Sequence, residues 1–272
     1  MIRVETDSGW MLIEHREHAR LAAEFAAHWG NADFAAPEPR GDILMAVSRH
    51  EDAWLERDAL PRLDSEGAPS ALSQELVGTT ATPKGVDLAN YLDMLGRTTE
   101  SIAPECPFAA IIVSMNNFDT VTSQTDSRGL SDSDKALRRK FLDGQLQRQV
   151  ELIGSLESAQ DDSEDLAPAR VLRAFEFLQA CDSLALVVAV RCPRPLALRH
   201  RHPLRNEAMV ELVCSPLGGD AYRISPFPFD ADALQFELPT RTLPQKNFKD
   251  ATAFRTAYAA APVGRLKVRI TR

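Results

Sequence analysis

Residues 168–190 form the most apolar helical pattern in the chain, and a single carboxylate interrupts it. Its apolar side chains recur at helical spacing over about four turns, so this stripe has to be buried against other elements. The stripe contains Val171, Leu172, Phe175, Leu178, Ala185, Leu186 and Ala189. Asp182 lies on the same stripe. A buried carboxylate is unfavourable by several kcal/mol unless it is paired, hydrogen-bonded or bound to a metal, so Asp182 requires a partner.

Two further predicted helices each place a histidine on an apolar face. In residues 15–29, His18 shares a helical stripe with apolar side chains. Residues 43–58 read ILMAVSRHEDAWLERD and predict a second helix, in which His50 points where the apolar residues point. The face of His50 also contains Ile43, Val47 and Trp54. Both histidines are therefore candidates to meet Asp182 in the core.

The two acidic residues that follow His50 point in different directions. Glu51 lies at the edge of the apolar face, whereas Asp52 lies on the far side of the helix. Histidines and a carboxylate from separate helices can form a structural hydrogen-bonded pair. They can also share a cation, because imidazole nitrogen and carboxylate oxygen are usual ligands of zinc, iron and manganese. Periodicity alone slightly favours the structural pair and leaves the metal site open.

The remaining patterns predict strands at both ends of the chain and helices between them. The strands cover residues 2–4, 10–13, 209–214, 222–225, 234–238 and 264–271, the last as an edge strand. The other helices cover residues 82–98, 107–115, 131–157 and 250–260. Loops are predicted over residues 60–82, 116–130 and 191–205. The last of these is basic and contains His200 and His202, which indicates a solvated loop or, alternatively, a local anion site.

Together these patterns predict an α+β chain, predominantly α, that folds as a single domain over residues 1–272. A helical core over residues 14–190 would carry a small C-terminal antiparallel sheet. That sheet would lie in a β-rich portion over residues 207–272 and pack with the N-terminal hairpin of residues 1–13.

Charge and apolar run lengths exclude several classes of partner. The formal net charge is −8, so no global basic field attracts nucleic acid or anionic lipids. No apolar run approaches the roughly 18 residues that span a bilayer, and the first residues do not resemble a signal peptide. Four cysteines without a CxxC pair are typical of reduced, buried thiols. We therefore expect a cytoplasmic protein whose partner is a small-molecule substrate, with no nucleic acid and no membrane.

The order of these polar residues resembles a known arrangement. His18, then His50 with Glu51, then Asp182 is similar to the H…HD…D pattern of the HD-domain superfamily, which includes metal-dependent phosphohydrolases and di-iron oxygenases. More closely, several phrases resemble the DUF3891 family of uncharacterised bacterial proteins. They are EHARLAAEFAAHWG, AVSRHEDAWLERD, PFAAIIVSMNN, FLQACDSLAL and AAAPVGRLKVRI. The resemblance implies an HD-domain-like helical core, and it names no reaction.

The chain departs from the family pattern at two positions. Family members usually read HHDDGW where this chain has RHEDAW, so Glu51 replaces the aspartate of the HD pair. Asn116 stands where the family has a histidine after the buried helix, and an amide is a weak metal ligand. The second departure argues against a second metal ion. His28 is a further possible ligand, although a core role beside Trp29 is favoured.

The function expected from these residues is metal-dependent hydrolysis of a phosphoester or related small metabolite. One divalent ion, zinc, manganese or iron, would be bound by His18, His50, Glu51 and Asp182. The catalytic and substrate-binding residues would be Asp52, Asp58, Asn116 and Trp54. Two alternatives stay open: a di-iron oxygenase with the same ligands, and a non-catalytic binding or scaffold protein with a degenerate site. A Ser or Cys nucleophile is disfavoured, because the chain has no GxSxG motif.

Overall fold

The computed structural model describes residues 1–73, 87–124, 130–159 and 166–272. Its helices are α1 (His15–His28), α2 (Arg40–Arg49), α3 (Leu55–Ala59), α4 (Leu88–Ile102), α5 (Pro107–Gln124), α6 (Asp132–Ala159), α7 (Pro168–Ala189) and α8 (Ala251–Ala260). Its strands are β1 (Ile2–Glu5), β2 (Trp10–Ile13), β3 (Leu72–Ser73), β4 (Leu196–Pro203), β5 (Met209–Gly218), β6 (Ala221–Ser225), β7 (Ala233–Leu243) and β8 (Val263–Thr271). Among these described residues, no helix has both the length and the hydropathy needed to cross a bilayer.

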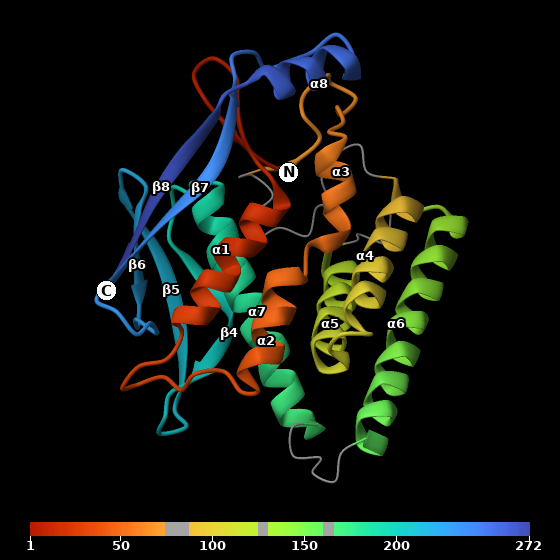
Figure 1. The fold of residues 1–272 in the computed structure, drawn as a ribbon, viewed down its shortest axis with the longest axis vertical. Helices are drawn as coiled ribbons and strands as arrows, with labels where there is room; N and C mark the ends of the chain where they lie inside the picture. Colours follow the sequence, from red (N-terminus) through yellow and green to blue (C-terminus); the bar gives the residue numbers. More distant parts are fainter. Residues whose placement is uncertain (74–86, 125–129, 160–165) are drawn as a thin grey trace.

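The described strands form one mixed sheet, and its strands β5, β6, β7 and β8 lie on the opposite side of the molecule from α4, α5 and α6 (Figure 1). Its strand order is β3-β1-β2-β7-β8-β6-β5-β4, with parallel pairing of β1 with β3 and of β6 with β8. The prediction of a predominantly helical, HD-domain-like core with a small C-terminal antiparallel sheet is therefore wrong. The local patterns located most of the strands. The N-terminal hairpin, which was predicted to pack with the C-terminal strands, joins their sheet through the antiparallel pairing of β2 with β7.

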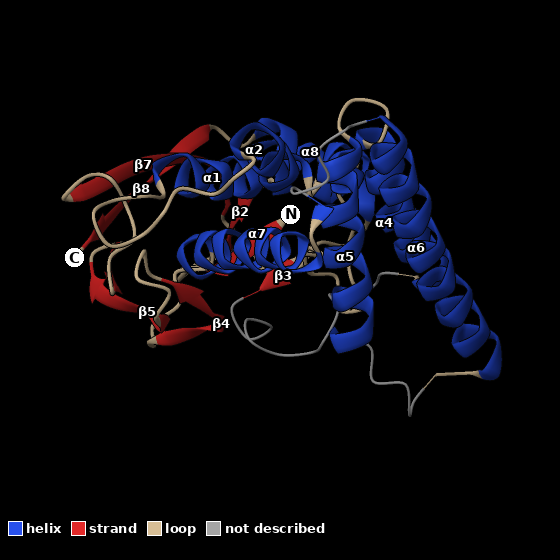
Figure 2. Ribbon diagram, turned by 90° about the horizontal axis from the view of Figure 1, so that it is seen from below, coloured by secondary structure: helices blue, strands red, loops and turns tan. Residues whose placement is uncertain are grey.

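The helices form two groups around α7 (Figure 2). On the sheet side, α7 packs against α1 and β4, and α1 packs against α2 and β7. On the other side, α5 contacts α7 and α2 and is covered in turn by α4 and α6. More than half of the residues of α7 are buried, as the apolar stripe predicted. Because α7 contacts both groups, a polar side chain on it can meet residues from several elements.

Several local predictions were confirmed and others were wrong. The hairpin of β1 and β2 and the helical assignment of residues 107–115 are confirmed. Residues 116–124 continue α5 where a loop was predicted. Residues 196–203 form β4, because alternate side chains such as Leu198 and His202 are buried in a strand that pairs with β5. The predicted helix start at residues 82–83 lies outside the described part of the chain.

The C-terminal strand β8 also differs from its prediction. It lies inside the sheet between β7 and β6, not at an edge. Its outward side chains are polar, and this alternation is equally compatible with an internal strand that has one face exposed to solvent. Alternation of apolar and polar side chains indicates that one face of a strand is buried. It does not show whether the strand lies at the edge of the sheet or between two other strands.

Gly9 in the β1–β2 turn provides a direct test of how the hairpin packs on the end of β7. A Cβ atom at Gly9 would overlap the carbonyl oxygen of Leu243 and lie 2.5 Å from the amide nitrogen of Gln245. We expect Gly9→Ala to lower the free energy of unfolding by about 2 kcal/mol, because backbone atoms on both sides have to move. Urea denaturation measures this change.

The matched control for this test is Gly154 in α6. A Cβ atom there meets nothing within 4 Å, and alanine favours the helix, so Gly154→Ala should be neutral or stabilising by up to about 1 kcal/mol. Equal effects of the two substitutions would contradict the packing of the turn against β7.

Candidate metal centre

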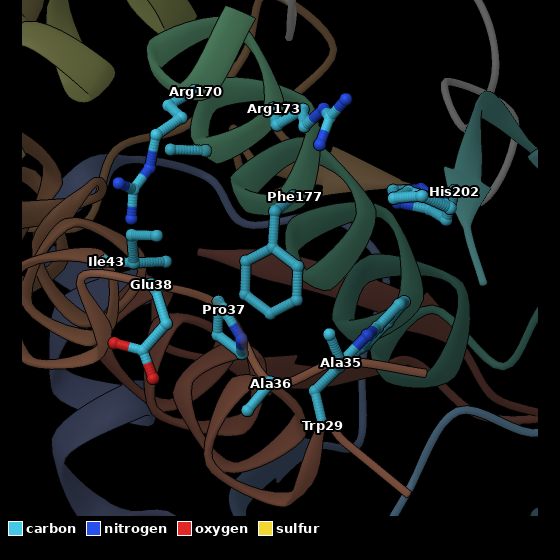
Figure 3. A pocket seen from close by; sticks show the side chains of 12 residues that line it. Trp29, Ala35, Ala36, Pro37, Glu38, Ile43, Arg170, Arg173, Phe177 and His202 are labelled. Atoms are coloured by element: carbon cyan, nitrogen blue, oxygen red, sulfur yellow. The ribbon is translucent and has the colours of Figure 1, made fainter. Parts of the chain in front are cut away.

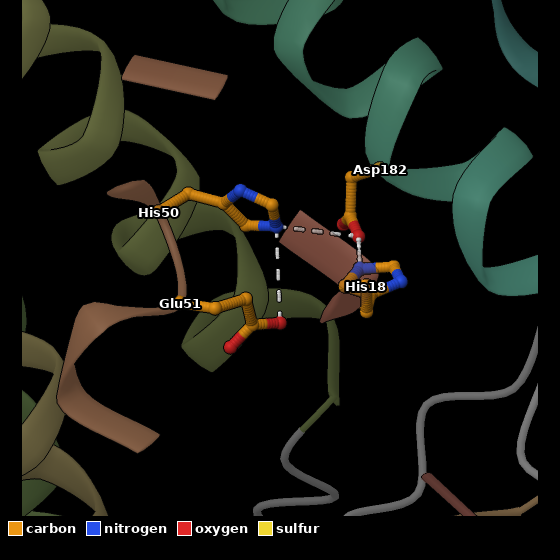
Figure 4. Close-up of side chains that lie close together, drawn as sticks. All are labelled: His18, His50, Glu51 and Asp182. Atoms are coloured by element: carbon orange, nitrogen blue, oxygen red, sulfur yellow. Dashed lines mark hydrogen bonds and ion pairs between the residues drawn. The ribbon is translucent and has the colours of Figure 1, made fainter. Parts of the chain in front are cut away.

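The helix predicted over residues 43–58 is interrupted at His50, and this interruption determines where the side chains of His50 and Glu51 point. Helix α2 ends at Arg49, and a 3-10 turn over Asp52–Trp54 leads into α3. The side-chain hydroxyl of Thr98 on α4 accepts a hydrogen bond from the Ala53 amide at 3.1 Å, which fixes the turn. This partner is remote in sequence, so the periodicity of the segment could not reveal the break. As a result, the side chains of His50 and Glu51 both face Asp182 and His18 (Figure 4).

Four side chains from three parts of the chain meet at this point. One potential ligand atom from each of His18, His50, Glu51 and Asp182 lies within 4.8 Å of every other. Asp182 Oδ1 is 2.7 Å from Nε2 of His18 and 3.5 Å from Nε2 of His50. Glu51 Oε1 is 3.8 Å from the same nitrogen of His50. The structure therefore brings together the four residues that the sequence predicted as metal ligands, and this cluster could hold a metal ion.

Hydrogen bonding orients His50 toward the cluster. Its Nδ1 lies 2.7 Å from the carbonyl oxygen of Val47, so Nδ1 carries a proton and donates it. In the neutral ring, the lone pair then belongs to Nε2, which faces Asp182. This Nε2 and the Nδ1 atom of His18 are buried and have no hydrogen-bond partner among the described residues. A buried imidazole nitrogen without a partner is unfavourable, and coordination of a cation would satisfy that of His50.

The opposite charges of His50 and Asp182 stabilise each other. Burial lowers the pKa of His50, but the Asp182 carboxylate beside it outweighs burial, and the pKa is raised to about 9. Burial alone would raise the pKa of Asp182, whereas its contacts with His18 and His50 hold that pKa well below its usual range. Without a metal, Asp182 is therefore ionised at neutral pH and His50 is positively charged. A metal ion would replace the proton on His50 as the partner of Asp182.

The separations around His50 are close to those around one small cation, and no two of the four ligand atoms are more than 4.8 Å apart. Atoms bound at about 2.0–2.1 Å to a tetrahedral zinc ion lie roughly 3.3 Å from one another. The separations of 3.5 Å and 3.8 Å around His50 are near this value, and the 2.7 Å contact of His18 with Asp182 would lengthen slightly. The histidine side chains are 2% exposed, whereas those of Glu51 and Asp182 are 19% and 30% exposed. Solvent therefore reaches the carboxylate side of the cluster.

A cavity opens beside Glu51, the one residue of the cluster that belongs to its lining. Its volume is about 490 Å³. It is lined by Glu14, Arg16, Ala19, Ser48, Glu51, Asp52, Leu55, Asp58 and Ala59. The two residues predicted to be catalytic, Asp52 and Asp58, are both in this lining. Asp52 forms an ion pair with Arg49 at 2.7 Å, which holds its carboxylate at the cavity wall.

Asp58 forms a second buried polar group at the base of this cavity. Its carboxylate accepts hydrogen bonds from the terminal amino group of Met1 at 2.6 Å and from the backbone amide of His15 at 2.5 Å. The His15 ring lies 3.0 Å away. Burial would raise the pKa of Asp58, but the His15 ring and the Met1 amine outweigh burial and hold that pKa far below its usual range. His15 was not predicted as the partner of Asp58. The two residues are far apart in the sequence, and His15 is the first residue of α1, where no periodic pattern marks it.

The remaining predicted site residues lie elsewhere. Trp54 stacks on His15 with 4.5 Å between ring centroids and does not line the cavity beside Glu51. Asn116 on α5 is buried and accepts a hydrogen bond from Gln179 at 3.3 Å, also outside the lining of that cavity. His28, considered as an additional ligand or core residue, is half-exposed and pairs with Asp230 at 2.8 Å. Both ideas about His28 were wrong.

Comparison with known proteins gives one match. A family model described as "Protein of unknown function (DUF3891)" matches residues 1–245. No curated protein and no solved structure matches the chain. The match supports the resemblance to DUF3891 and does not extend to the HD-domain superfamily.

Proposed function

The chain belongs to the DUF3891 family, whose description names no reaction, and from its own side chains we propose that it is a metal-dependent hydrolase. The observation that carries this proposal is the convergence of His18, His50, Glu51 and Asp182 within 4.8 Å, with Glu51 in the lining of a cavity. Zinc, manganese and iron are the ions that suit this mixture of imidazole and carboxylate ligands. A bound divalent ion would supply Lewis acidity and lower the pKa of a coordinated water.

The residues of the cluster and of the cavity would have different roles. The buried histidines would bind the ion, and the hydrogen bond of His50 to the Val47 carbonyl orients its ring for this. Glu51 is the one member of the cluster that also lines the cavity, so its free carboxylate oxygen is placed to accept a proton from an attacking water. Asp52 and Asp58 would then position the substrate from the same cavity wall.

A phosphoester or related small metabolite is the substrate class we propose. The cavity of about 490 Å³ accommodates a small metabolite. Its lining includes Arg16, whose guanidinium pairs with Glu14 at 2.8 Å and would exchange this partner for a phosphate oxygen. Two of the four lining carboxylates are neutralised within the protein, since Asp52 pairs with Arg49 and Asp58 with Met1. They therefore oppose an anionic substrate less than their number suggests.

The number of ligands favours this proposal over the oxygenase alternative. A di-iron centre needs side chains for a second ion, and the described residues contain one cluster of this kind. The non-catalytic scaffold alternative shares every structural feature with the hydrolase. Measurement of metal content and turnover separates the three.

Metal analysis of protein purified without chelator tests the proposal. We expect about one equivalent of zinc, manganese or iron per chain, a lower melting temperature after treatment with EDTA, and phosphate release from small phosphomonoesters that stops with EDTA. His50→Ala should remove the metal, whereas Val47→Ala, a neighbouring buried truncation in α2, should retain it.

Three results would contradict the proposal in different ways. Absence of metal, together with equal stability losses for His50→Ala and Val47→Ala, would leave only a structural histidine–aspartate pair. Iron with oxygen-dependent turnover would support the oxygenase. Stoichiometric metal without turnover of any phosphoester would support the scaffold.

A further inference from the structure

A second cavity lies at the other end of α2 and α7, away from the proposed metal centre (Figure 3). Its volume is about 310 Å³, and it is partly open to solvent. The loop after α1, the first turn of α2, the first half of α7 and the end of β4 form its walls. It shares no lining residue with the cavity beside Glu51, so its occupation does not depend on the proposed hydrolase.

The walls of this second cavity are mainly aromatic and apolar. The rings of Trp29 and Phe177 meet edge to face, with 5.0 Å between their centroids. Ile43, Pro37 and Ala36 complete this apolar part of the lining. A flat apolar molecule would therefore find both a ring face and a ring edge, which are the arrangements that aromatic groups prefer.

Positively charged side chains outnumber negatively charged ones around the cavity. Arg170 and Arg173, one turn apart on α7, contribute two positive charges, and Glu38 contributes one negative charge. Burial and the neighbouring His200 lower the pKa of His202 to about 4, so its ring is neutral at pH 7. The cavity therefore has a net positive charge, carried by guanidinium groups that bind carboxylates in a planar, two-point geometry.

His202 adds an independent sign that the cavity is a ligand site. This side chain is 5% exposed, and its Nε2 atom is buried with no hydrogen-bond partner among the described residues. Its ring lies edge to face with Trp29, at 5.5 Å between centroids, in the wall of the cavity. An unpaired buried nitrogen is unfavourable, and a polar group of a bound ligand that reached it would satisfy it.

From these features we propose that the second cavity binds a small aromatic carboxylate, with its ring against Trp29 and Phe177 and its carboxylate on Arg173 and Arg170. The volume of the cavity is near the lower limit for small-molecule sites, which suits a ligand of one or two fused rings. A cationic aromatic molecule would meet the two arginines and be repelled.

Isothermal titration calorimetry with 2-naphthoate, on the full chain, tests this proposal. We expect saturable binding of one molecule per chain and no binding of 2-naphthylmethylammonium, which has the same rings and the opposite charge. Arg173→Gln should weaken binding of 2-naphthoate by about ten-fold or more, because it removes a charge-assisted hydrogen bond. Ala36→Phe should abolish binding by placing a ring in the cavity.

Arg139→Gln on α6 is the control for charge, because it removes an exposed arginine remote in sequence from the cavity. This variant should bind 2-naphthoate as the wild type does. Thermal melting establishes that each variant is folded. If Ala36→Phe does not fold, the exposed Arg173→Gln variant still decides the matter.

The proposal is overturned by any of three results. They are no saturable heat at millimolar 2-naphthoate, equal binding of the cationic probe, and binding that neither Arg173→Gln nor Ala36→Phe weakens.

Discussion

Asp182→Asn is expected to reduce metal affinity by about 100-fold or more, although it leaves the size of the side chain unchanged. Asp182 is the carboxylate that approaches both histidines, at 2.7 Å from His18 and 3.5 Å from His50. Asparagine keeps the size of the side chain but removes the charge, and neutral amides are weak ligands of transition metals. Loss of an outer partner of a ligand already weakens binding by 10–100-fold in typical metal sites, so loss of a ligand should have at least that effect.

Competition with a chromophoric chelator measures this affinity, and melting curves with and without EDTA provide a second measurement. The wild type should melt at a lower temperature with EDTA, whereas Asp182→Asn should melt at the same temperature in both conditions. Asp119→Asn is the matched control, because Asp119, like Asp182, accepts side-chain hydrogen bonds, here from Gln179 at 2.9 Å and Arg199 at 3.0 Å, but is not part of the cluster. Unchanged metal affinity in Asp182→Asn would show that the ion, if present, binds elsewhere.

Asp58→Asn is expected to lower the free energy of unfolding by about 3 kcal/mol. Removal of one partner from a buried ion pair is expensive because the other partner stays buried without its counter-charge. In this protein the terminal amino group of Met1, 2.6 Å from Asp58, would lose its carboxylate. Guanidinium denaturation at pH 7 measures the change, and Asp230→Asn, which alters an exposed carboxylate paired with His28, is the control.

The stability supplied by Asp58 should also depend on pH. Its pKa in the folded protein is held far below the usual value of about 4 in an unfolded chain. Because the folded pKa is the lower one, the stabilisation is complete above about pH 4 and is lost progressively as the pH falls toward the folded value. The difference in stability between wild type and Asp58→Asn should therefore shrink between pH 5 and about pH 2. A constant difference over this range would contradict an ionised Asp58 in the folded state.

The sequence predicted the four members of the cluster but not how they meet. His18 and Asp182 were identifiable because an ionisable group on an apolar helical stripe requires a partner, and both lie in uninterrupted helices. Glu51 was assigned to the edge of a continuous helix. Its actual position depends on the break after Arg49, which the Thr98 hydroxyl fixes from α4. A hydrogen bond between residues 45 positions apart leaves no local pattern in the sequence.

The sheet and the cavities were less predictable, for the same physical reason. Alternating burial identified β5, β6, β7 and β8, whereas the parallel pairing of β6 with β8 depends on which distant strands come together. The two cavities are formed by side chains from as many as four elements each, and no single segment shows them. In the sequence, Arg173 reads as an exposed residue of a helix and His202 as a residue of a loop. Neither residue alone indicates the second cavity, which both of them line.

The position of β8 has a consequence for biosynthesis. In the described sheet, β8 is the only strand that joins the half formed by β3, β1, β2 and β7 to the half formed by β6, β5 and β4. It is also the last of these strands to leave the ribosome. Until it emerges, β7 and β6 each present an open hydrogen-bonding edge, and open edges pair with other chains. β8 therefore completes the sheet, and a substitution that delays its pairing would leave the edges of β7 and β6 open to other chains.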